Sequence, residues 1–350
     1  MTTDNFIINF DDPILITGSN GFIGTRVVKT LLDYGFSNLR CFIRSSRNLK
    51  TLSRAINSSN KVKIEFVSGN LLSLEDCKKA TEGVALILHL AAGIEKSFSG
   101  AFMNSVVTTK NLLETIIGSK DLKRFLNVSS FSVYSNAKIK RGKLLDESCE
   151  VESKPQERGE AYCFGKIKQD ETVLEYSKKY NIPFVIVRPG YVIGPGKKSI
   201  PPYVGIDTFG FFLHLGGRNK IPLSYIDNCA EAIVLASIKK GVNGQIFNIV
   251  DDNLPSSRKF LKMYKKNVGH FNSIYIPYSA FYIFCYFWEQ YSKWSNGQLP
   301  PAFNRKRCSA VWKGNEYSNQ KLKNLLGWKP KVSIDKALDN YFEYQRKVLL

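Results

Sequence analysis

The stretch Pro13-Ile-Leu-Ile-Thr-Gly-Ser-Asn-Gly-Phe-Ile-Gly24 decides the fold of this chain. Its apolar run at residues 14–16 is typical of a strand buried on both faces of a parallel sheet. Three glycines follow at a spacing of three, and residues 25–32 then repeat apolar side chains at helical spacing. This order predicts a phosphate site, because the glycines let backbone approach a pyrophosphate and the helix start offers free N–H groups. A purely structural turn is the alternative, since G-x-x-G-x-x-G departs from the G-x-G-x-x-G spacing of dinucleotide sites.

Strand and helix patterns alternate along the rest of the chain. Short apolar segments typical of buried strands are followed by segments of helical periodicity. Strands are expected at residues 38–44, 64–67, 84–92, 124–130, 183–188 and 245–250, helices at 73–82, 103–117 and 161–180, and a loop at 137–160. This alternation predicts an α/β fold with a doubly wound parallel sheet and right-handed crossovers.

The alternation weakens where prolines and glycines interrupt the pattern after residue 189. We therefore expect a nucleotide-binding domain at residues 1–190 with a returning segment at 222–250. The remaining residues, 191–221 and 251–350, are expected to form a smaller substrate-binding lobe.

The composition of the 350 residues limits the class of protein. Seven cysteines without paired spacing suit a reducing cytoplasm, and three distant histidines disfavour a metal site. The N-terminus has no signal-peptide pattern, and no run reaches the roughly 20 apolar residues of a membrane span. We therefore expect a cytoplasmic protein.

The formal net charge of +20 favours anionic partners such as nucleotides, nucleic acid or an acidic membrane surface. Residues 254–350 alone hold seventeen Lys or Arg against five Asp or Glu. Solubility or the composition of the source proteome is the alternative explanation. The basic residues follow no recognised nucleic-acid motif, so we do not expect nucleic acid as a partner.

The end of the second expected strand selects the cofactor in a dinucleotide fold. An acidic residue there binds the adenosine ribose, whereas Arg accommodates a 2′-phosphate. Arg44 occupies this place, followed by Ser45, Ser46 and Arg47. The sequence therefore favours NADP over NAD, with a solvated basic turn as the alternative.

Tyr162 and Lys166 stand four residues apart on an expected helix, so their side chains share one face. A neighbouring ammonium favours the phenolate and is expected to lower the pKa of Tyr162. The phenol could then exchange a proton with a substrate hydroxyl or carbonyl while hydride moves to or from the cofactor. Ser130 ends the fifth expected strand, where parallel sheets place their ligands, and could hydrogen-bond the substrate oxygen. A surface Tyr/Lys pair is the alternative for these two side chains.

Taken together, these motifs make the chain resemble an extended short-chain dehydrogenase/reductase. The resemblance is to the NAD-dependent epimerase/dehydratase and 3β-hydroxysteroid dehydrogenase group, whose nucleotide-binding domain is of the Rossmann type. It runs from about Ile14 to Leu338. It rests on the segments Thr17–Gly24, His89–Ala92, Val128–Tyr134, Tyr162–Lys166, Arg188–Gly190, Pro222–Asn228 and Leu326–Pro330.

The resemblance implies a catalytic Ser130–Tyr162–Lys166 triad, with Tyr162 as acid/base, Lys166 also on the nicotinamide ribose, and Asn104 in support. It implies a homodimer formed through the helices that carry Asn104 and Tyr162. Asn70 stands where the family usually has an Asp facing the adenine, which weakens that contact. Beside Arg44, Tyr162 and Lys166, the implied cofactor contacts are Gly18, Asn20, Gly21, Phe22, Ile23, Gly24, Asn70, Leu71, Leu90, Ala91, Ala92, Pro189 and Gly190.

Departures from the family pattern narrow the expected reaction. Nucleotide-sugar 4,6-dehydratases typically carry Thr-Asp-Glu where this chain has Ser130-Phe-Ser132, so elimination is disfavoured. Epimerisation or simple oxidation and reduction remain open, on a nucleotide sugar or related precursor in polysaccharide biosynthesis. A sterol- or lipid-alcohol dehydrogenase at a membrane surface is the alternative enzyme. A dinucleotide-sensing regulator is the alternative outside enzymes, although a sensor has no need of the three triad side chains.

One aromatic stretch, residues 274–288, has no polar face in its second half. A helix that is apolar all round is buried, interfacial or membrane-facing, and this one is too short to span a bilayer. Packing within the lobe or between subunits is the favoured interpretation. Peripheral membrane contact and a lid over a greasy substrate are the alternatives.

Overall fold

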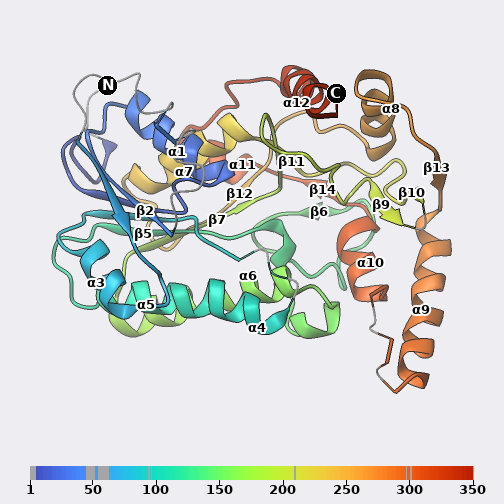
Figure 1. Cartoon of the computed structure of the whole chain (residues 1–350), viewed down its shortest axis with the longest axis horizontal. Helices are drawn as coiled ribbons and strands as arrows, with labels where there is room; N and C mark the ends of the chain where they lie inside the picture. The colour runs from blue at the N-terminus through green and yellow to red at the C-terminus, as the bar shows by residue number, and fades with distance from the viewer. Residues whose placement is uncertain are drawn as a thin grey trace.

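The computed structural model describes residues 5–44, 52–53, 63–93, 95, 97–208, 210–296, 298–299 and 302–349. Seven parallel strands form its central sheet (Figure 1). In spatial order they are β12 (Ile246–Ile249), β7 (Phe184–Pro189), β5 (Arg124–Val128), β4 (Leu86–His89), β1 (Ile14–Thr17), β2 (Asn38–Ile43) and β3 (Lys63–Ser68). Strand order reverses beside β1, where Ile14 pairs with Leu39 of β2 on one side and with Leu86 of β4 on the other. The predicted doubly wound Rossmann-type sheet is thereby confirmed.

Helices cover both faces of this sheet (Figure 1). Successive side chains of a strand point to opposite faces of a sheet. Ile14 and Ile16 of β1 therefore lie in the hydrophobic core on one face, and Leu15 lies in the core on the other. The first core contains α1 (Phe22–Asp33), α7 (Ile226–Ile238) and α11 (Gln320–Leu326), and the second contains α3 (Leu74–Thr81), α5 (Thr108–Thr115) and α6 (Ala161–Tyr180). Helix α11 and Trp328 thus pack on the sheet, although they lie within the range expected for the lobe.

The expected helix at 103–117 is not one regular helix. The chain forms α4 (Phe98–Ala101), then a π-helical turn η2 (Phe102–Val107), and then α5. A π turn widens a helix locally and is frequent at functional sites. Here it carries Asn104, so the irregularity coincides with a predicted site residue.

The segments outside the sheet are short strands and helices. The expected loop 137–160 contains β6 (Leu144–Leu145) and η4 (Pro155–Arg158), after the single turn η3 (Phe131–Val133). Small sheets join β13 (Ser273–Tyr275), β10 (Phe211–His214) and β9 (Gly205–Thr208), β11 (Leu223–Tyr225) with β8 (Tyr191–Ile193), and β14 (Glu316–Tyr317) with β6. The remaining helices are α8 (Ser257–Asn267), α9 (Tyr278–Trp294), α10 (Arg305–Trp312) and α12 (Ile334–Leu349).

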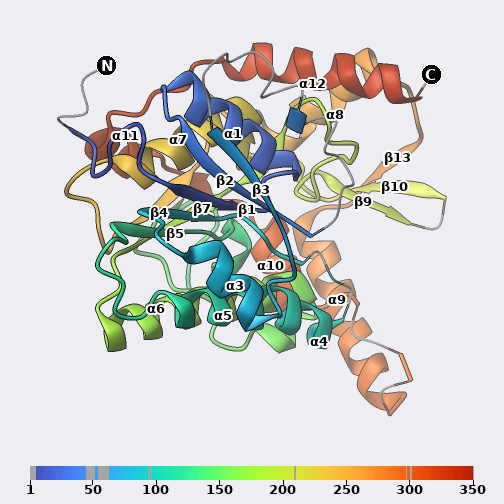
Figure 2. The ribbon, with the colours of Figure 1, turned by 60° about the vertical axis from the view of Figure 1, so that its left-hand side comes forward.

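Three further cores lie beside the two that cover the sheet, and one of them packs η3 and β6 against α6 through Phe131, Leu145 and Ile167. The other two involve the outer helices. One contains α8 and α12, and the other packs α9 against α10 through Phe281, Cys285, Cys308 and Trp312. In Figure 2, α9 extends away from the body of the molecule. No helix in the described part of the chain combines the length and the apolar character that a bilayer span requires.

Candidate active site

The glycine turn between β1 and α1 is shaped for a close backbone approach. A Cβ on Gly24 would lie 2.0 Å from the carbonyl oxygen of Gly18, so only glycine fits there. Gly18 has φ +69° and lies against the backbone of Leu90 and Ala91. No side chain caps the first turn of α1, whose N-cap is Gly21. The turn therefore fits a dinucleotide pyrophosphate, as the sequence predicts, and brings together residues of the first and fourth strand ends.

The ends of β2 and β3 lie at the same carboxyl edge of the sheet as this turn. Arg44 directly follows β2 and is exposed, while Ser45, Ser46 and Arg47 lie outside the described residues. The side-chain oxygen of Asn70 accepts a hydrogen bond from Leu72 N (3.1 Å) and so shapes its own turn. Its amide nitrogen remains the group that could face an adenine.

The loop after β4 connects the glycine turn to the π turn of η2. Ala91 N donates to the hydroxyl of Thr17 (3.3 Å), which holds the loop against β1. Asn104 Nδ2 donates to Glu95 Oε1 (2.8 Å), and Gly93 passes so close that a Cβ there would lie 2.7 Å from Asn104. Asn104 therefore braces this loop from its helix.

Ser130 and Tyr162 are brought into contact by the packing of α6 under the end of β5. The Ser130 hydroxyl hydrogen-bonds Tyr162 and also accepts a bond from Ser132 N (3.1 Å). Burial raises the pKa of Tyr162, and the bond to Ser130 opposes that shift only in part. The expected lowering by Lys166 is wrong for this structure, because burial of the phenol outweighs any effect of the ammonium.

Lys166 lies on the same helix face but turns its ammonium toward the sheet. Its Nζ donates to Val128 O (2.6 Å) and to Gln169 Oε1 (2.9 Å). Burial lowers the pKa of Lys166 to about 8, opposed by the charge of Asp170. Gln169 Nε2 donates to the hydroxyl of Thr109 (2.8 Å), which also contacts His89 Nε2 (2.9 Å). A buried chain of hydrogen bonds thus leads from Lys166 to the fourth strand.

A buried ion pair between Asp170 and Arg188 also holds α6 in place. Asp170 directly follows Gln169 on this helix. Asp170 and Arg188 are each about 3% exposed at the side chain and lie 3.2 Å apart. The carboxylate also accepts from Asn127 Nδ2 (3.0 Å) and Ser129 Oγ (2.8 Å). Arg188 stacks over the ring of Tyr134, 4.9 Å from its centroid. These contacts fix α6 against β5 and β7 and so set the position of Tyr162 and Lys166.

Charged residues just before Tyr162 were missed by the sequence analysis. Arg158 is buried, donates to Ser132 O (2.6 Å) and pairs with Glu160 (2.6 Å). Arg307 of α10 pairs with the same carboxylate (3.3 Å). Burial raises the pKa of Tyr203 to about 12, with Arg158 and Tyr162 among its electrostatic neighbours. Two charges immediately before the expected helix were the only sequence signal of this cluster.

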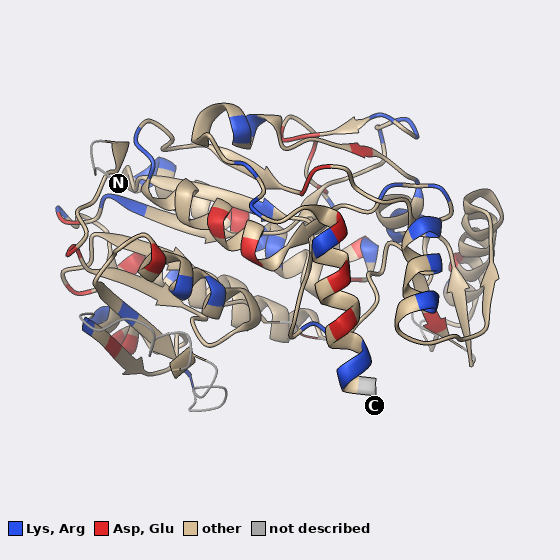
Figure 3. Ribbon diagram, turned by 90° about the horizontal axis from the view of Figure 1, so that it is seen from above, with Lys and Arg blue, Asp and Glu red and all other residues tan. Residues whose placement is uncertain are grey.

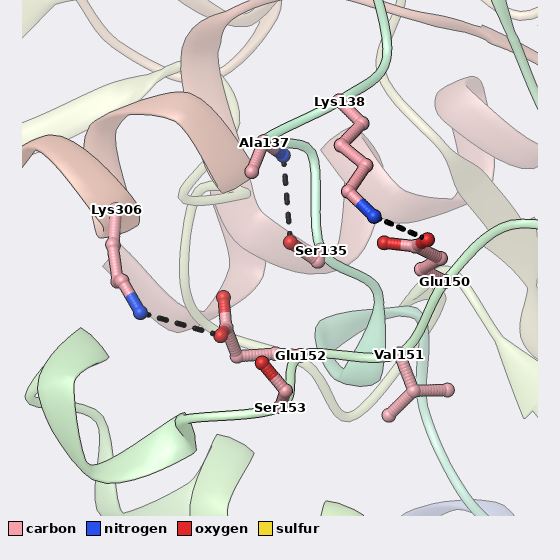
Figure 4. Close-up of a pocket in the computed structure, with 8 residues that line it drawn as sticks. All are labelled: Ser135, Ala137, Lys138, Glu150, Val151, Glu152, Ser153 and Lys306. Carbon is pink, nitrogen blue, oxygen red and sulfur yellow. Dashed lines mark hydrogen bonds and ion pairs between the residues drawn. The ribbon is translucent and has the colours of Figure 1, made fainter.

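Two hollows lie beyond the Ser130–Val133 segment. The first, drawn in Figure 4, has a volume of about 430 Å³ and is lined by Ser135, Ala137, Lys138, Glu150, Val151, Glu152, Ser153 and Lys306. The second, of about 990 Å³, extends between Glu152 and the helices α9 and α10. Neither is lined by Ser130, Tyr162 or Lys166. Among the described residues, no group of His, Cys, Asp and Glu could hold a metal ion.

The remaining predicted contacts lie at the end of β7. Gly190 N donates to Ile249 O (2.9 Å), and a Cβ on Gly190 would lie 2.2 Å from the carbonyl oxygen of Pro222. Glycine is therefore required where the chain leaves the sheet toward β8. Pro189 is buried and pairs with Ile249 of β12.

Comparison with known proteins agrees with this arrangement. The model of the NAD dependent epimerase/dehydratase family matches residues 14–250. A trifunctional UDP-glucose 4,6-dehydratase/UDP-4-keto-6-deoxy-D-glucose 3,5-epimerase/UDP-4-keto-L-rhamnose-reductase of Arabidopsis thaliana is 30% identical over 255 residues, 67% of this chain. The match covers only 36% of that plant protein.

Two further similarities extend over nearly the whole chain. Sterol-4-alpha-carboxylate 3-dehydrogenase, decarboxylating, of Mus musculus is 24% identical over 338 residues, 93% of this chain and 88% of that protein. UDP-glucuronic acid 4-epimerase of Bacillus cereus, solved with UDP-glucuronic acid and NAD, superposes with a TM-score of 0.70. It is 21% identical and covers 96% of this chain and 99% of its own, so it shares the fold.

Proposed function

This chain belongs to the NAD-dependent epimerase/dehydratase family, and we propose that it interconverts a hydroxyl and a keto group with a nicotinamide cofactor. The observation that carries the proposal is the contact between Ser130 and the half-buried Tyr162 on a helix that also carries Lys166. A half-buried phenol held by a serine hydroxyl is suited to proton exchange at a substrate oxygen.

We propose that Tyr162 is the acid/base and that Ser130 hydrogen-bonds the reacting oxygen. The raised pKa keeps the phenol protonated, so it can donate a proton to a keto oxygen in the direction of reduction. In the reverse direction it must accept a proton, and a nearby positive charge would favour the phenolate. Asn104 keeps the loop after β4 in place through Glu95.

The residues of the glycine turn fit a dinucleotide, which supplies or accepts hydride when bound. We propose that the first turn of α1 binds the pyrophosphate and that Lys166 binds the nicotinamide ribose. Arg44, exposed at the end of β2, supports a preference for NADP. Arg44→Ala should weaken NADP about tenfold or more and leave NAD nearly unchanged. Lys29→Ala, which removes an exposed charge from α1, is the matched control, and an equal effect of both variants would refute the role of Arg44.

We propose a nucleotide sugar or related glycan precursor as substrate. Support comes from the fold shared with an epimerase that was solved with UDP-glucuronic acid, and from the similarity to the plant UDP-sugar enzyme. Ser130-Phe131-Ser132 offers hydroxyls and no carboxylate, which favours epimerisation or simple redox chemistry over dehydration. We further propose a cytoplasmic homodimer assembled through the helices that carry Asn104 and Tyr162, which are η2 with its continuation α5, and α6.

A lipid alcohol at a membrane surface is the second candidate substrate. The similarity to the sterol dehydrogenase covers more of both chains than the plant match does. The aromatic side chains exposed on α9 favour the same candidate.

Native mass spectrometry of the purified protein tests these proposals. A tightly held dinucleotide would support an epimerase, which recycles its cofactor, and a co-purified nucleotide sugar would identify the substrate class. Protein that is empty but binds added NADPH reversibly would support a dehydrogenase or reductase. Bound sterol or lipid would support the second candidate, and protein that binds no nicotinamide cofactor would refute the proposal.

A further inference from the structure

Helix α9 carries a continuous apolar stripe on the side that faces away from the protein. Ile283, Phe287, Tyr291 and Trp294 follow one another at helical spacings of four, four and three. Their exposed fractions are 56%, 65%, 50% and 77%, although each is a large apolar or aromatic side chain. Phe284 and Tyr286 widen the stripe and are each 42% exposed.

The opposite face of α9 is already covered. Phe281 and Cys285 are buried against α10, and the Phe281 ring meets that of Trp312 edge-on at 5.4 Å. Arg305 of α10 bonds Glu289 (2.8 Å) and lies over the ring of Tyr286 (4.9 Å). The exposed stripe is therefore a second apolar face of a helix whose packing face is accounted for. Figures 1 and 2 both show α9 projecting beyond the sheet domain.

The charges around the stripe select its partner. The sole acidic residue of α9, Glu289, is half-buried and paired with Arg305, while Lys293 is exposed in the last turn. The chain as a whole carries a net charge of +20, and Lys and Arg are spread over many elements (Figure 3). An apolar and aromatic stripe on a basic protein is complementary to an anionic lipid surface. Trp and Tyr are the side chains enriched at the level of lipid headgroups.

The length of α9 distinguishes lying on a bilayer from crossing it. Its 17 residues rise about 25 Å, less than the roughly 30 Å of a hydrocarbon core, and the stripe follows the helix axis. We propose that the protein docks on anionic membranes with α9 in the plane of the interface and this stripe inserted among the lipids. The proposal does not depend on which substrate the enzyme takes.

Sedimentation with vesicles tests this directly with the full-length protein. Vesicles of phosphatidylcholine with about one-third phosphatidylserine should bind it, pure phosphatidylcholine should bind less, and salt should weaken the binding. The double variant Phe287→Ser/Trp294→Ser should bind at least about tenfold more weakly. Phe66→Ser/Leu325→Ser is the matched control, because it removes two exposed apolar side chains from β3 and α11 and should bind like the wild type.

Folding and self-association are separated from lipid binding by two further measurements. Both double variants should retain the wild-type melting temperature, since all four side chains are exposed. Trp294 fluorescence should shift to the blue on addition of anionic vesicles, and the shift should be lost in Trp294→Phe. Absence of binding to either vesicle, equal binding by the α9 variant, or a stripe variant that instead turns an oligomer into a monomer would overturn the proposal.

Discussion

Helices α6 and α9 break the usual rule of burial in opposite directions. Helix α6 buries Lys166, Gln169 and Asp170, whereas α9 exposes a stripe that includes Phe287 and Trp294. Polar groups are buried at a cost unless they are paired, and large exposed apolar faces are rare on soluble monomers. The polar face of α6 is explained inside the molecule, by its partners in the sheet. For the apolar face of α9, we propose an explanation outside the molecule, at a lipid surface.

The largest effect is expected from the catalytic end of α6. Tyr162→Phe should lower kcat about 10²- to 10⁴-fold, because it removes the proposed acid/base group, while cofactor still binds. Turnover and cofactor titration measure the two properties separately. Tyr176→Phe is the matched control on the same helix, since its hydroxyl bonds the surface residue Glu114 (3.0 Å). Unchanged turnover in Tyr162→Phe would refute Tyr162 as the acid/base. Wild-type protein that binds cofactor without any turnover would indicate a cofactor sensor instead of an enzyme.

Part of the arrangement on α6 could be predicted from the sequence, and part of it could not. The spacing of Tyr162 and Lys166 placed both on one face, and the order of strand ends placed Ser130 nearby. The direction in which Lys166 points could not be predicted, because Val128 O and Gln169 become its partners only after α6 packs on β5. The pKa of Tyr162 likewise depends on burial, which spacing does not report.

The charged cluster around Glu160 and the exposed face of α9 could not be predicted from the sequence, because both depend on contacts between distant segments. Glu160 and Arg307 pair across nearly 150 residues, from a segment expected to be a loop to a helix of the expected lobe. The pattern of residues 274–288 is apolar all round, so it could not show which face α10 covers. The favoured interpretation is packing within the lobe or between subunits. Packing within the lobe describes the inner face of α9, and a contact between subunits at the outer face stays untested.

The buried ion pair of α6 should give the next largest effect, on stability. Asp170→Asn leaves the guanidinium of Arg188 buried without its counter-charge and should lower the free energy of unfolding by about 3–5 kcal/mol. Urea unfolding followed by circular dichroism measures the change. Glu171→Gln breaks the neighbouring surface pair with Lys168 and should cost no more than about 1 kcal/mol. Equal losses would mean that burial does not distinguish the two carboxylates.

Substitutions on the two faces of α9 should differ by a similar amount in their effect on the free energy of unfolding. Phe281→Ala opens a cavity in the core shared with Trp312 and should cost about 3–5 kcal/mol of unfolding free energy. Phe287→Ala, six residues along the helix and 65% exposed, should change stability by less than about 0.5 kcal/mol in solution. Thermal and urea unfolding of both variants make the comparison. A large loss in Phe287→Ala would show that its face is covered within the protein or by a second copy.

The smallest effect is expected in the pH dependence of kcat/KM. It tests whether Gln169 influences the pKa of Lys166. Burial holds the pKa of Lys166 at about 8, below its ordinary 10.5, so the ammonium is lost as pH rises through 8 in the folded protein. If catalysis requires that charge, kcat/KM should fall about tenfold per pH unit above this value.

The same shift makes a prediction for folding, with a defined sign. Between pH 8 and 10.5 the unfolded chain holds the Lys166 proton and the folded chain does not, so this residue makes stability rise with pH in that window. Below pH 8 the full cost of burying the ammonium is present. A Lys166→Met variant should therefore lose this contribution to the pH dependence of unfolding.

Substitutions of Gln169 should move the alkaline limb of kcat/KM in opposite directions. Gln169→Leu removes an acceptor of the Lys166 ammonium (2.9 Å) and should shift the limb to lower pH, because a hydrogen bond to the charged form favours it. Gln169→Glu places a negative charge at the same position and should shift the limb to higher pH. A role in packing alone would change the rate at all pH values without moving the limb. Opposite shifts would show that Gln169, a buried polar residue two helical turns from Tyr162, sets the protonation of Lys166, the lysine of the proposed catalytic triad.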